Sequence, residues 1–181
     1  VDQQQVTRDS NNFSDVITGV SFSLKAADVG TTETVTIELD KNAVTGKVNN
    51  FVSAYNSLTD TMQTLSAYDA ETGRAGALQG DSVLRGVQNQ IRQTLTSTIS
   101  GLDFGTLAEL GVTTGETGLL TLDGEKLDAV MTTDFTAVSE LFASENGLAG
   151  SLEDLLEGYI ASDGILSART EGLQSSIESI A

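Results

Sequence analysis

Apolar side chains recur at alternating intervals of four and three residues between positions 44 and 65 of the chain. This spacing is the a and d pattern of a coiled-coil seam, and it indicates a long helix packed lengthwise on another helix. The predicted structural helix seam consists of Val44, Val48, Phe51, Tyr55, Leu58, Met62 and Leu65. The sequence therefore predicts a helix over about residues 42–67, capped by Asp40 or Asn42.

The first forty residues follow a different pattern, in which apolar and polar residues alternate. A period of two is typical of half-buried strands, so we predict strands over residues 20–25 and 34–39, joined by a turn at residues 26–32. A further short strand is predicted at residues 4–8, and a single helical turn at residues 13–17. The amino-terminal part is therefore predicted to be β-rich.

The stretch from residue 67 to residue 80 is rich in glycine and predicts a loop. A second amphipathic helix is predicted to begin after it, at Asp81 or Ser82. One face of this helix carries Leu84, Val87, Ile91, Leu95 and Ile99. Such a face suits antiparallel packing on the first helix.

Glycines recur too closely between residues 101 and 122 for a long helix, and we predict a small hairpin that pairs residues 111–114 with residues 119–122. Three helices are predicted next, beginning at Asp123, at Asp134 and at Ala149. After Gly164 the four-and-three spacing returns at Leu166, Thr170, Leu173, Ile177 and Ile180. The predicted fold class is therefore α+β, with an amino-terminal β-rich part followed by an α-helical bundle that contains coiled-coil-like long helices and a small β-hairpin.

The composition excludes several classes of function. The 181 residues include no Cys, His, Trp or Pro, so thiolate nucleophiles, imidazole bases and the nitrogen and sulfur ligands of zinc are missing. A formal net charge of −17 repels a phosphate backbone, which argues against a nucleic-acid partner. The sequence has no apolar run of the length that a membrane helix needs, so we expect no membrane partner either.

Candidate chemical motifs have simpler structural explanations. The segment from Asp69 to Gly80 has the length of an EF-hand loop, but Arg74 replaces the required glycine and Gly80 replaces the bidentate glutamate. Ser82 lacks a histidine base and a nucleophile elbow, so a helix cap explains it better. The 26 acidic residues offer many carboxylate pairs, which a charged helix face explains. We therefore expect no catalytic, metal-binding or cofactor-binding residues.

Five segments, taken in order, resemble a known family. They read RDSNNFSDVITGVSFSLK at residues 8–25, TVTIELD at residues 34–40, VNNFVSAYNSL at residues 48–58, GALQGDSVLRGVQNQIR at residues 76–92 and LAELGVTTGETGLLTLDGEKLDAVMTTDFTAVSELF at residues 107–142. Together they are similar to the bacterial flagellar filament cap proteins, also called flagellar hook-associated protein 2. Because the chain begins at Val1 without a methionine and its last helical pattern is cut at Ala181, we expect a portion from the second half of a longer polypeptide.

The resemblance implies a division at about residue 40. Residues 1–40 would be the C-terminal part of a β-rich head domain, and residues 41–181 would form a mainly helical leg domain that is truncated at its C-terminus. It also implies a secreted, extracellular protein at the tip of the flagellum. There the full-length protein would form a homo-oligomeric ring, a pentamer or hexamer, and would retain flagellin and promote its folding and polymerisation. Flagellin and the hook-filament junction proteins are the implied partners.

Other functions remain open at the level of sequence. One alternative is an adhesin-type binding module for host mucin or glycans, and another is a different axial flagellar protein, such as flagellin or a hook-filament junction protein. The residues that contact flagellin or neighbouring subunits are not identified by any pattern. We expect the seam to be intramolecular, facing the second helix and the restarting seam, and the isolated chain to associate weakly through Leu173, Ile177 and Ile180.

Overall fold

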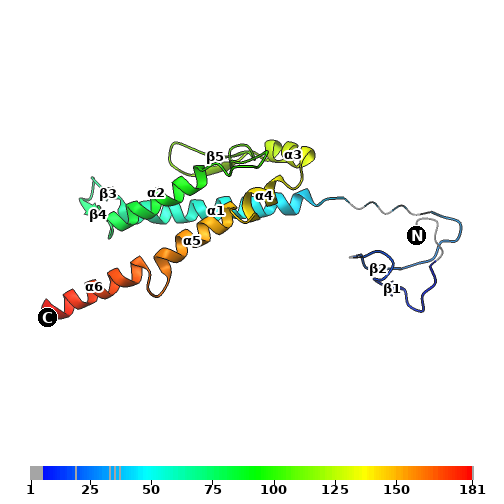
Figure 1. The fold of residues 1–181 in the computed structure, drawn as a ribbon, viewed down its shortest axis with the longest axis horizontal. Helices are drawn as coiled ribbons and strands as arrows, with labels where there is room; N and C mark the ends of the chain where they lie inside the picture. The colour runs from blue at the N-terminus through cyan, green and yellow to red at the C-terminus, as the bar shows by residue number, and fades with distance from the viewer. Residues whose placement is uncertain (1–5, 19, 33, 35, 37, 181) are drawn as a thin grey trace. The chain divides into compact units, whose positions relative to one another are not determined.

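The computed structural model of the chain describes residues 6–18, 20–32, 34, 36 and 38–180. The chain divides into two compact units, Val1–Glu38 and Leu39–Ala181. In the described residues the first unit carries two very short strands, and the second carries six helices and two hairpins, which can be followed by colour in Figure 1.

The amino-terminal unit contains one small antiparallel pairing, of β1 (Asn12–Phe13) with β2 (Phe22–Ser23). Phe13 lies opposite Phe22 in this pairing, and their rings stack with centroids 5.3 Å apart. Arg8 and Asp15 of the same unit form an ion pair of 2.8 Å. None of the described residues of this unit is buried, so local contacts rather than a core hold it together.

The predictions for this unit are partly confirmed. β2 covers the middle of the strand predicted at residues 20–25, whereas Phe13, predicted on a helical turn, lies in β1 because its ring stacks across the pair on Phe22. The strand predicted at residues 34–39 depends on Val35 and Ile37, which lie outside the described residues. The first residues of the strand predicted at residues 4–8 also lie outside them.

The helix α1 (Lys41–Ser66) is the longest element of the second unit and has nearly the predicted bounds. The Asp40 carboxylate accepts a hydrogen bond of 2.9 Å from the Ala43 N–H and so satisfies an unpaired amide of the first turn. The buried residues of the helix are Val48, Val52, Thr59 and Met62. α1 packs against β6, α3 and α2, which makes it the central element of the unit.

The segment after α1 was predicted to be a loop, but it contains a short hairpin of β3 (Tyr68–Asp69) and β4 (Arg74–Ala75). The Asp69 carboxylate accepts hydrogen bonds from the Glu71 N–H at 2.9 Å and the Thr72 hydroxyl at 2.6 Å, which closes the turn. Glycine content alone did not reveal this hairpin.

The helix α2 (Ser82–Thr96) runs back along α1 in the antiparallel sense that was predicted (Figure 1). Asp81 caps it, accepting a hydrogen bond of 2.9 Å from the Leu84 N–H. Ile99 was predicted on the apolar face of this helix, but it lies three residues beyond the helix end. Its N–H donates instead to the Gly105 carbonyl at 2.8 Å, which turns the chain toward the next hairpin.

The predicted glycine-rich hairpin is present as β5 (Val112–Thr114) and β6 (Leu120–Leu122). It leads directly into α3 (Gly124–Thr133), which the Asp123 side chain caps through a hydrogen bond of 3.0 Å from the Lys126 N–H. Gly111 precedes the hairpin with a φ of 89°, and a Cβ there would lie 2.8 Å from the Asp123 carbonyl oxygen. Only glycine lets the hairpin and the start of α3 approach this closely.

Three further helices complete the unit, namely α4 (Ala137–Ala143), α5 (Leu148–Ile160) and α6 (Ile165–Ile180). The predicted start of α4 at Asp134 is wrong, because the Asp134 carboxylate accepts from the Thr136 N–H at 2.9 Å and closes a turn before the helix begins. α5 packs against α2 and α4, and α6 packs on α5. The Tyr159 hydroxyl donates to Gln90 Oε1 at 2.9 Å, which joins α5 to α2.

The core of the unit lies between α1, α2, the second hairpin, α3 and α4. Its most deeply buried side chains are Leu110, Leu127, Leu141 and Val112. Burying an aliphatic side chain of this size stabilises a fold by about 1.5–3 kcal/mol relative to leaving it exposed. In a chain without cysteine, this apolar burial takes the place of disulfide cross-links.

A polar face of α1 binds the β5–β6 hairpin. The Asn56 side chain donates to the Leu120 carbonyl at 2.9 Å and accepts from the Leu120 N–H at 2.7 Å. The Tyr55 hydroxyl donates to the Gly118 carbonyl at 3.1 Å, and Gln63 Nε2 donates to the Thr117 carbonyl at 3.0 Å. The side-chain amide of Asn56 thus satisfies the edge of β6 as a neighbouring strand would.

Replacing Asn56 with alanine should destabilise the unit, because the N–H and C=O of the buried Leu120 would lose their partners. We expect the free energy of unfolding in urea to fall by about 2–4 kcal/mol. The matched control is Asn50→Ala, an exposed position on the same helix, where the change should stay within about 0.5 kcal/mol. Equal effects of the two substitutions would contradict this role for Asn56.

Thr59 is a buried polar residue whose hydroxyl finds no hydrogen-bond partner among the described residues. The isosteric change Thr59→Val removes this unpaired hydroxyl, so we expect it to raise the free energy of unfolding by about 1 kcal/mol. Thr61→Val, at an exposed position two residues further along α1, serves as the control and should change stability by less than about 0.5 kcal/mol. A clear loss of stability in Thr59→Val would show that the hydroxyl is satisfied.

Candidate functional site

The predicted seam of α1 lies mainly on the inner side of the helix. Val48 and Met62 are buried, Val44, Phe51 and Tyr55 are partly buried against the core, and Leu65 is half-buried. Leu58 departs from the pattern with 40% exposure, and Val52 and Thr59 are buried although they lie outside the seam. The reason is that α1 packs on three elements, so its buried face is wider than a two-position stripe.

Two packing partners were predicted for this seam, and one of them is found. α1 packs on α2, as expected, but α6, which carries the restarting seam, packs on α5. None of the described residues of α6 is buried, and Leu173, Ile177 and Ile180 are 56%, 68% and 86% exposed. α6 therefore presents its apolar residues outward.

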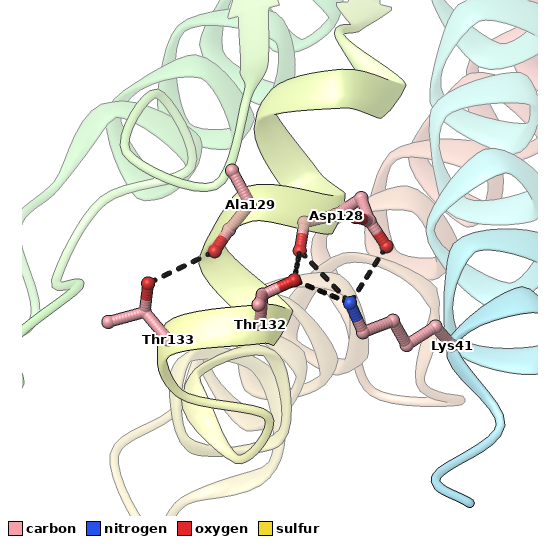
Figure 2. A network of polar contacts seen from close by, with 5 residues as sticks. All are labelled: Lys41, Asp128, Ala129, Thr132 and Thr133. Atoms are coloured by element: carbon pink, nitrogen blue, oxygen red, sulfur yellow. Dashed lines mark hydrogen bonds and ion pairs between the residues drawn. The ribbon is translucent and has the colours of Figure 1, made fainter.

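A network of polar contacts ties the start of α1 to α3 (Figure 2). Lys41 Nζ donates to Asp128 Oδ1 at 3.0 Å, to the Asp128 carbonyl at 3.4 Å and to Thr132 Oγ1 at 2.5 Å. The Thr132 hydroxyl in turn donates to the Asp128 carbonyl at 2.8 Å. Since the ammonium group has three donors and all three are used, this lysine is a structural cross-link and not a free nucleophile.

A second ion pair of the helical unit joins α6 to Asp81, the residue that caps α2. Both oxygens of Asp81 accept from the Arg169 guanidinium, and Asp81 Oδ1 also caps α2. The Leu84 N–H and the Arg169 charge lower the pKa of Asp81 below its ordinary value of 3.8. The Asp81 carboxylate therefore both caps α2 and pairs with Arg169 of α6.

Two adjoining apolar grooves lie along α1, α4 and α5. They have volumes of about 340 and 690 Å³ and share Phe51 and Phe142, whose rings meet edge to face with centroids 5.2 Å apart. Polar atoms are scarce in the lining of the smaller groove, where Lys47 and Ser139 are the polar residues. Such a surface suits contact with apolar side chains rather than chemistry on a polar substrate.

The residues weighed as chemical candidates have structural roles. Asp69, from the segment with EF-hand length, is occupied by its own turn, and the hydrogen bond from the Thr72 side chain lowers the pKa of its carboxyl. Ser82, expected to be a helix cap, is instead the first residue of α2, because Asp81 caps this helix. In the residues that the structure describes, no group of three or more His, Cys, Asp or Glu side chains is placed to hold a metal ion. No helix in this described part has the length and apolar character needed to cross a membrane.

Comparison with known proteins gives a consistent family. The family model described as "flagellar hook-associated protein 2 C-terminus" matches residues 1–181. The chain is 35% identical over 176 residues to the A-type flagellar hook-associated protein 2 of Pseudomonas aeruginosa, with 94% of this chain and 37% of the relative covered. It is 33% identical over 187 residues to flagellar hook-associated protein 2 of Salmonella typhimurium, with 97% and 39% covered.

A solved structure of the same family is also similar to this chain. The crystal structure of the D1-D2-D3 domains of the flagellar cap protein FliD from Escherichia coli superposes with a TM-score of 0.75 at 34% identity, covering 90% of this chain and 45% of that one. These matches define a class of structural proteins of the bacterial flagellum. Within that class, the chain belongs to the family of the flagellar hook-associated protein 2 C-terminus. It spans about two fifths of the length of these two relatives.

The comparisons confirm the predicted family and the α+β fold class. No pattern in the sequence marks Asn56, Gln63, Lys41 or Arg169 as residues that fix the arrangement of elements. Asn56 lies beside Tyr55 of the seam in the quoted segment VNNFVSAYNSL, but a polar residue on a helix is ordinary until its partner is known. The lysine and arginine contacts reach partners 87 and 88 residues away, and single-sequence periodicity carries no signal for such pairs.

The ion pair of Asp81 predicts a dependence of stability on pH. Because the pKa of Asp81 is lower in the folded chain, the folded chain binds fewer protons at this group than the unfolded chain does. The stabilisation from the charged Asp81 carboxylate is therefore complete above pH 3.8, and it is lost as the pH falls through the lowered pKa.

A double-mutant cycle of Asp81→Asn and Arg169→Gln measures this effect, since asparagine caps a helix about as well as aspartate and so keeps the contact with α2. We expect a favourable coupling in urea unfolding at about pH 6 that shrinks well below pH 3.8 and also weakens at high salt. A coupling that is independent of both pH and salt would contradict the ion pair.

Proposed function

We propose that this chain is the carboxyl-terminal portion of a flagellar filament cap protein that retains flagellin at the growing tip and promotes its folding and polymerisation. The observation that carries the proposal is the similarity along nearly the whole chain to a flagellar cap protein, with 34% identity and a TM-score of 0.75. In this proposal the chain acts by contact and catalyses no reaction.

The division of the chain into two units supports separate roles for these two parts within the parent protein. We propose that the amino-terminal unit is part of a head domain and that the helical unit is part of a leg domain. The exposed apolar residues of α6 and the grooves at Phe51 and Phe142 are surfaces on which such a leg could engage other helices. A helical bundle cross-linked by Lys41 and Arg169 would supply a rigid support for a head.

The proposed partners follow from the proposed role. The parent protein would form a homo-oligomeric ring outside the cell, with flagellin below it and hook-filament junction proteins at the base of the filament. A pentamer or hexamer remains a prediction. The alternative of an adhesin for mucin or glycans is less well supported, because the chain has only nine aromatic residues from which a carbohydrate-stacking surface could be built.

Deletion of the gene for the parent protein tests the proposal in the bacterium from which the chain comes. We expect the mutant to release flagellin monomer into the medium and to lack full-length filaments, as seen by immunoblotting and electron microscopy. The intact gene should restore both. A mutant that still builds full filaments without leaking flagellin would refute the proposed function.

Two matched substitutions in the restored gene show whether the folded helical unit is needed. Leu127→Asp places a charge at a fully buried position of α3, at a cost of several kcal/mol that is comparable with the stability of a domain. Ala129→Asp places the same charge on the exposed side of α3. We expect the first gene to fail and the second to restore filaments, with circular dichroism of both purified chains as the control for folding.

A further inference from the structure

The larger of the two apolar grooves, the α5 groove, follows one face of α5 for most of the length of the helix. Phe51 of α1 and Phe142 of α4 form one side of it, and α5 forms the other. The α5 positions that line it recur after three or four residues, namely Ala149, Leu152, Glu153, Leu156, Glu157 and Ile160. Between the first and the last of these positions the helix rises about 16 Å, which is the length of three turns.

The apolar positions of this groove have the spacing of a helix–helix seam. Ala149, Leu152, Leu156 and Ile160 follow one another at intervals of three, four and four residues. A helix with such a stripe packs on another helix that lies along it. Leu152 and Leu156 are only partly buried, and Ile160 is 69% exposed although it is a large apolar residue. The α5 groove therefore has the shape and the surface to receive a helix.

Two glutamates line the groove beside this seam. Glu153 and Glu157 are exposed and lie one turn apart. Like charges four residues apart repel each other on a helix, and Glu157 also lies in the last turn of α5, where the helix dipole disfavours a negative charge. Neither glutamate takes part in the ion pairs found among the described residues. Cationic side chains beside the two carboxylates would relieve both repulsions.

The chain itself does not supply these cations. No lysine or arginine occurs in the sequence between Lys126 and Arg169, which includes all of α4 and α5. The same stretch contains the acidic residues Asp128, Asp134, Glu140, Glu145, Glu153, Asp154, Glu157 and Asp163. In the whole chain no two basic residues are three or four positions apart, so a second copy has no pair of cations one turn apart on a helix. The charge pattern therefore favours a different partner.

We propose that the α5 groove binds an amphipathic helix of a partner protein that carries two basic residues one turn apart beside its apolar stripe. The apolar side chains of this helix would pack on the seam of α5. Its lysine or arginine side chains would pair with Glu153 and Glu157, because charges beside a helix–helix seam select the partner. The proposal rests on the proposed function, since it names the chemistry of a helix that the leg would engage.

The binding of two designed peptides to the 181-residue chain tests this proposal. Both peptides are alanine-based helices of about 20 residues with leucine at the seam positions. They differ only at two positions four residues apart beside the leucines, where one carries lysine and the other glutamate. We expect fluorescence anisotropy to show about tenfold tighter binding of the lysine peptide at low salt, and a smaller difference at high salt.

Charge reversal in the groove should reverse this preference. The double variant Glu153→Lys/Glu157→Lys should bind the glutamate peptide more tightly than the lysine peptide. Glu145→Lys/Asp154→Lys is the matched control, because it changes the net charge equally at exposed positions outside the groove. This control should keep the original preference for the lysine peptide.

A single substitution tests the apolar part of the contact. Ile160→Ser should weaken the binding of the lysine peptide at least about fivefold, because it removes an exposed apolar side chain from the seam. Ile180→Ser makes the same change at an exposed position of α6 outside the groove and should leave binding unchanged. Circular dichroism of both variants checks that the chain remains folded.

Equal binding of the two peptides, or a preference for lysine that survives charge reversal at Glu153 and Glu157, would overturn the proposal. Self-association of the chain that Ile160→Ser abolishes would assign the groove to a second copy. Failure of the intact parent protein to bind the lysine peptide would assign it to the parent's own chain, and either result would also overturn the proposal. None of these measurements involves filament growth, so their failure is distinguishable from a failure of the gene-deletion test.

Discussion

The contact between Asn56 and both backbone groups of Leu120 fixes the position of most other elements in the helical unit. Leu120 is 3% exposed, so its N–H and C=O cannot turn to solvent and must find partners inside the protein. Asn56 supplies both, and this places β6 against the middle of α1. Because β6 continues through Asp123 directly into α3, the same contact also determines where α3 lies. Lys41 then joins α3 back to the first turn of α1, so that α1, the hairpin and α3 are held together at both ends.

Local signals in the sequence predicted the helices well, and contacts between distant residues account for most of what they missed. The caps Asp40, Asp81 and Asp123 and the glycine-rich hairpin follow from short-range patterns, and the structure contains them. Leu58 was assigned to the buried side because heptad spacing treats α1 as one of two facing helices. In the structure a hairpin and two helices surround α1, so the buried face is broader and includes Thr59.

The candidate site was less predictable than the fold. The absence of histidine and cysteine favours packing over chemistry, but it does not indicate which surfaces of the folded chain remain uncovered. Phe51 was expected in the core and does pack against it, but with Phe142 it also lines two grooves that open outward. Asn56 is a polar residue on an amphipathic helix, and its role follows only from its contact with Leu120 of β6, 64 residues further along the chain.

The helix α6 illustrates a consequence of placing a regular element outside the core. It has 16 residues, includes Gly172 in its interior and has no buried side chain among its described residues. A helix of this length is marginal in water without tertiary packing, and an interior glycine weakens it further. The free energy needed to unwind the residues beyond Arg169 is therefore expected to be smaller than that of the core helices. The helical state of its last turns is thus inexpensive to form and to lose.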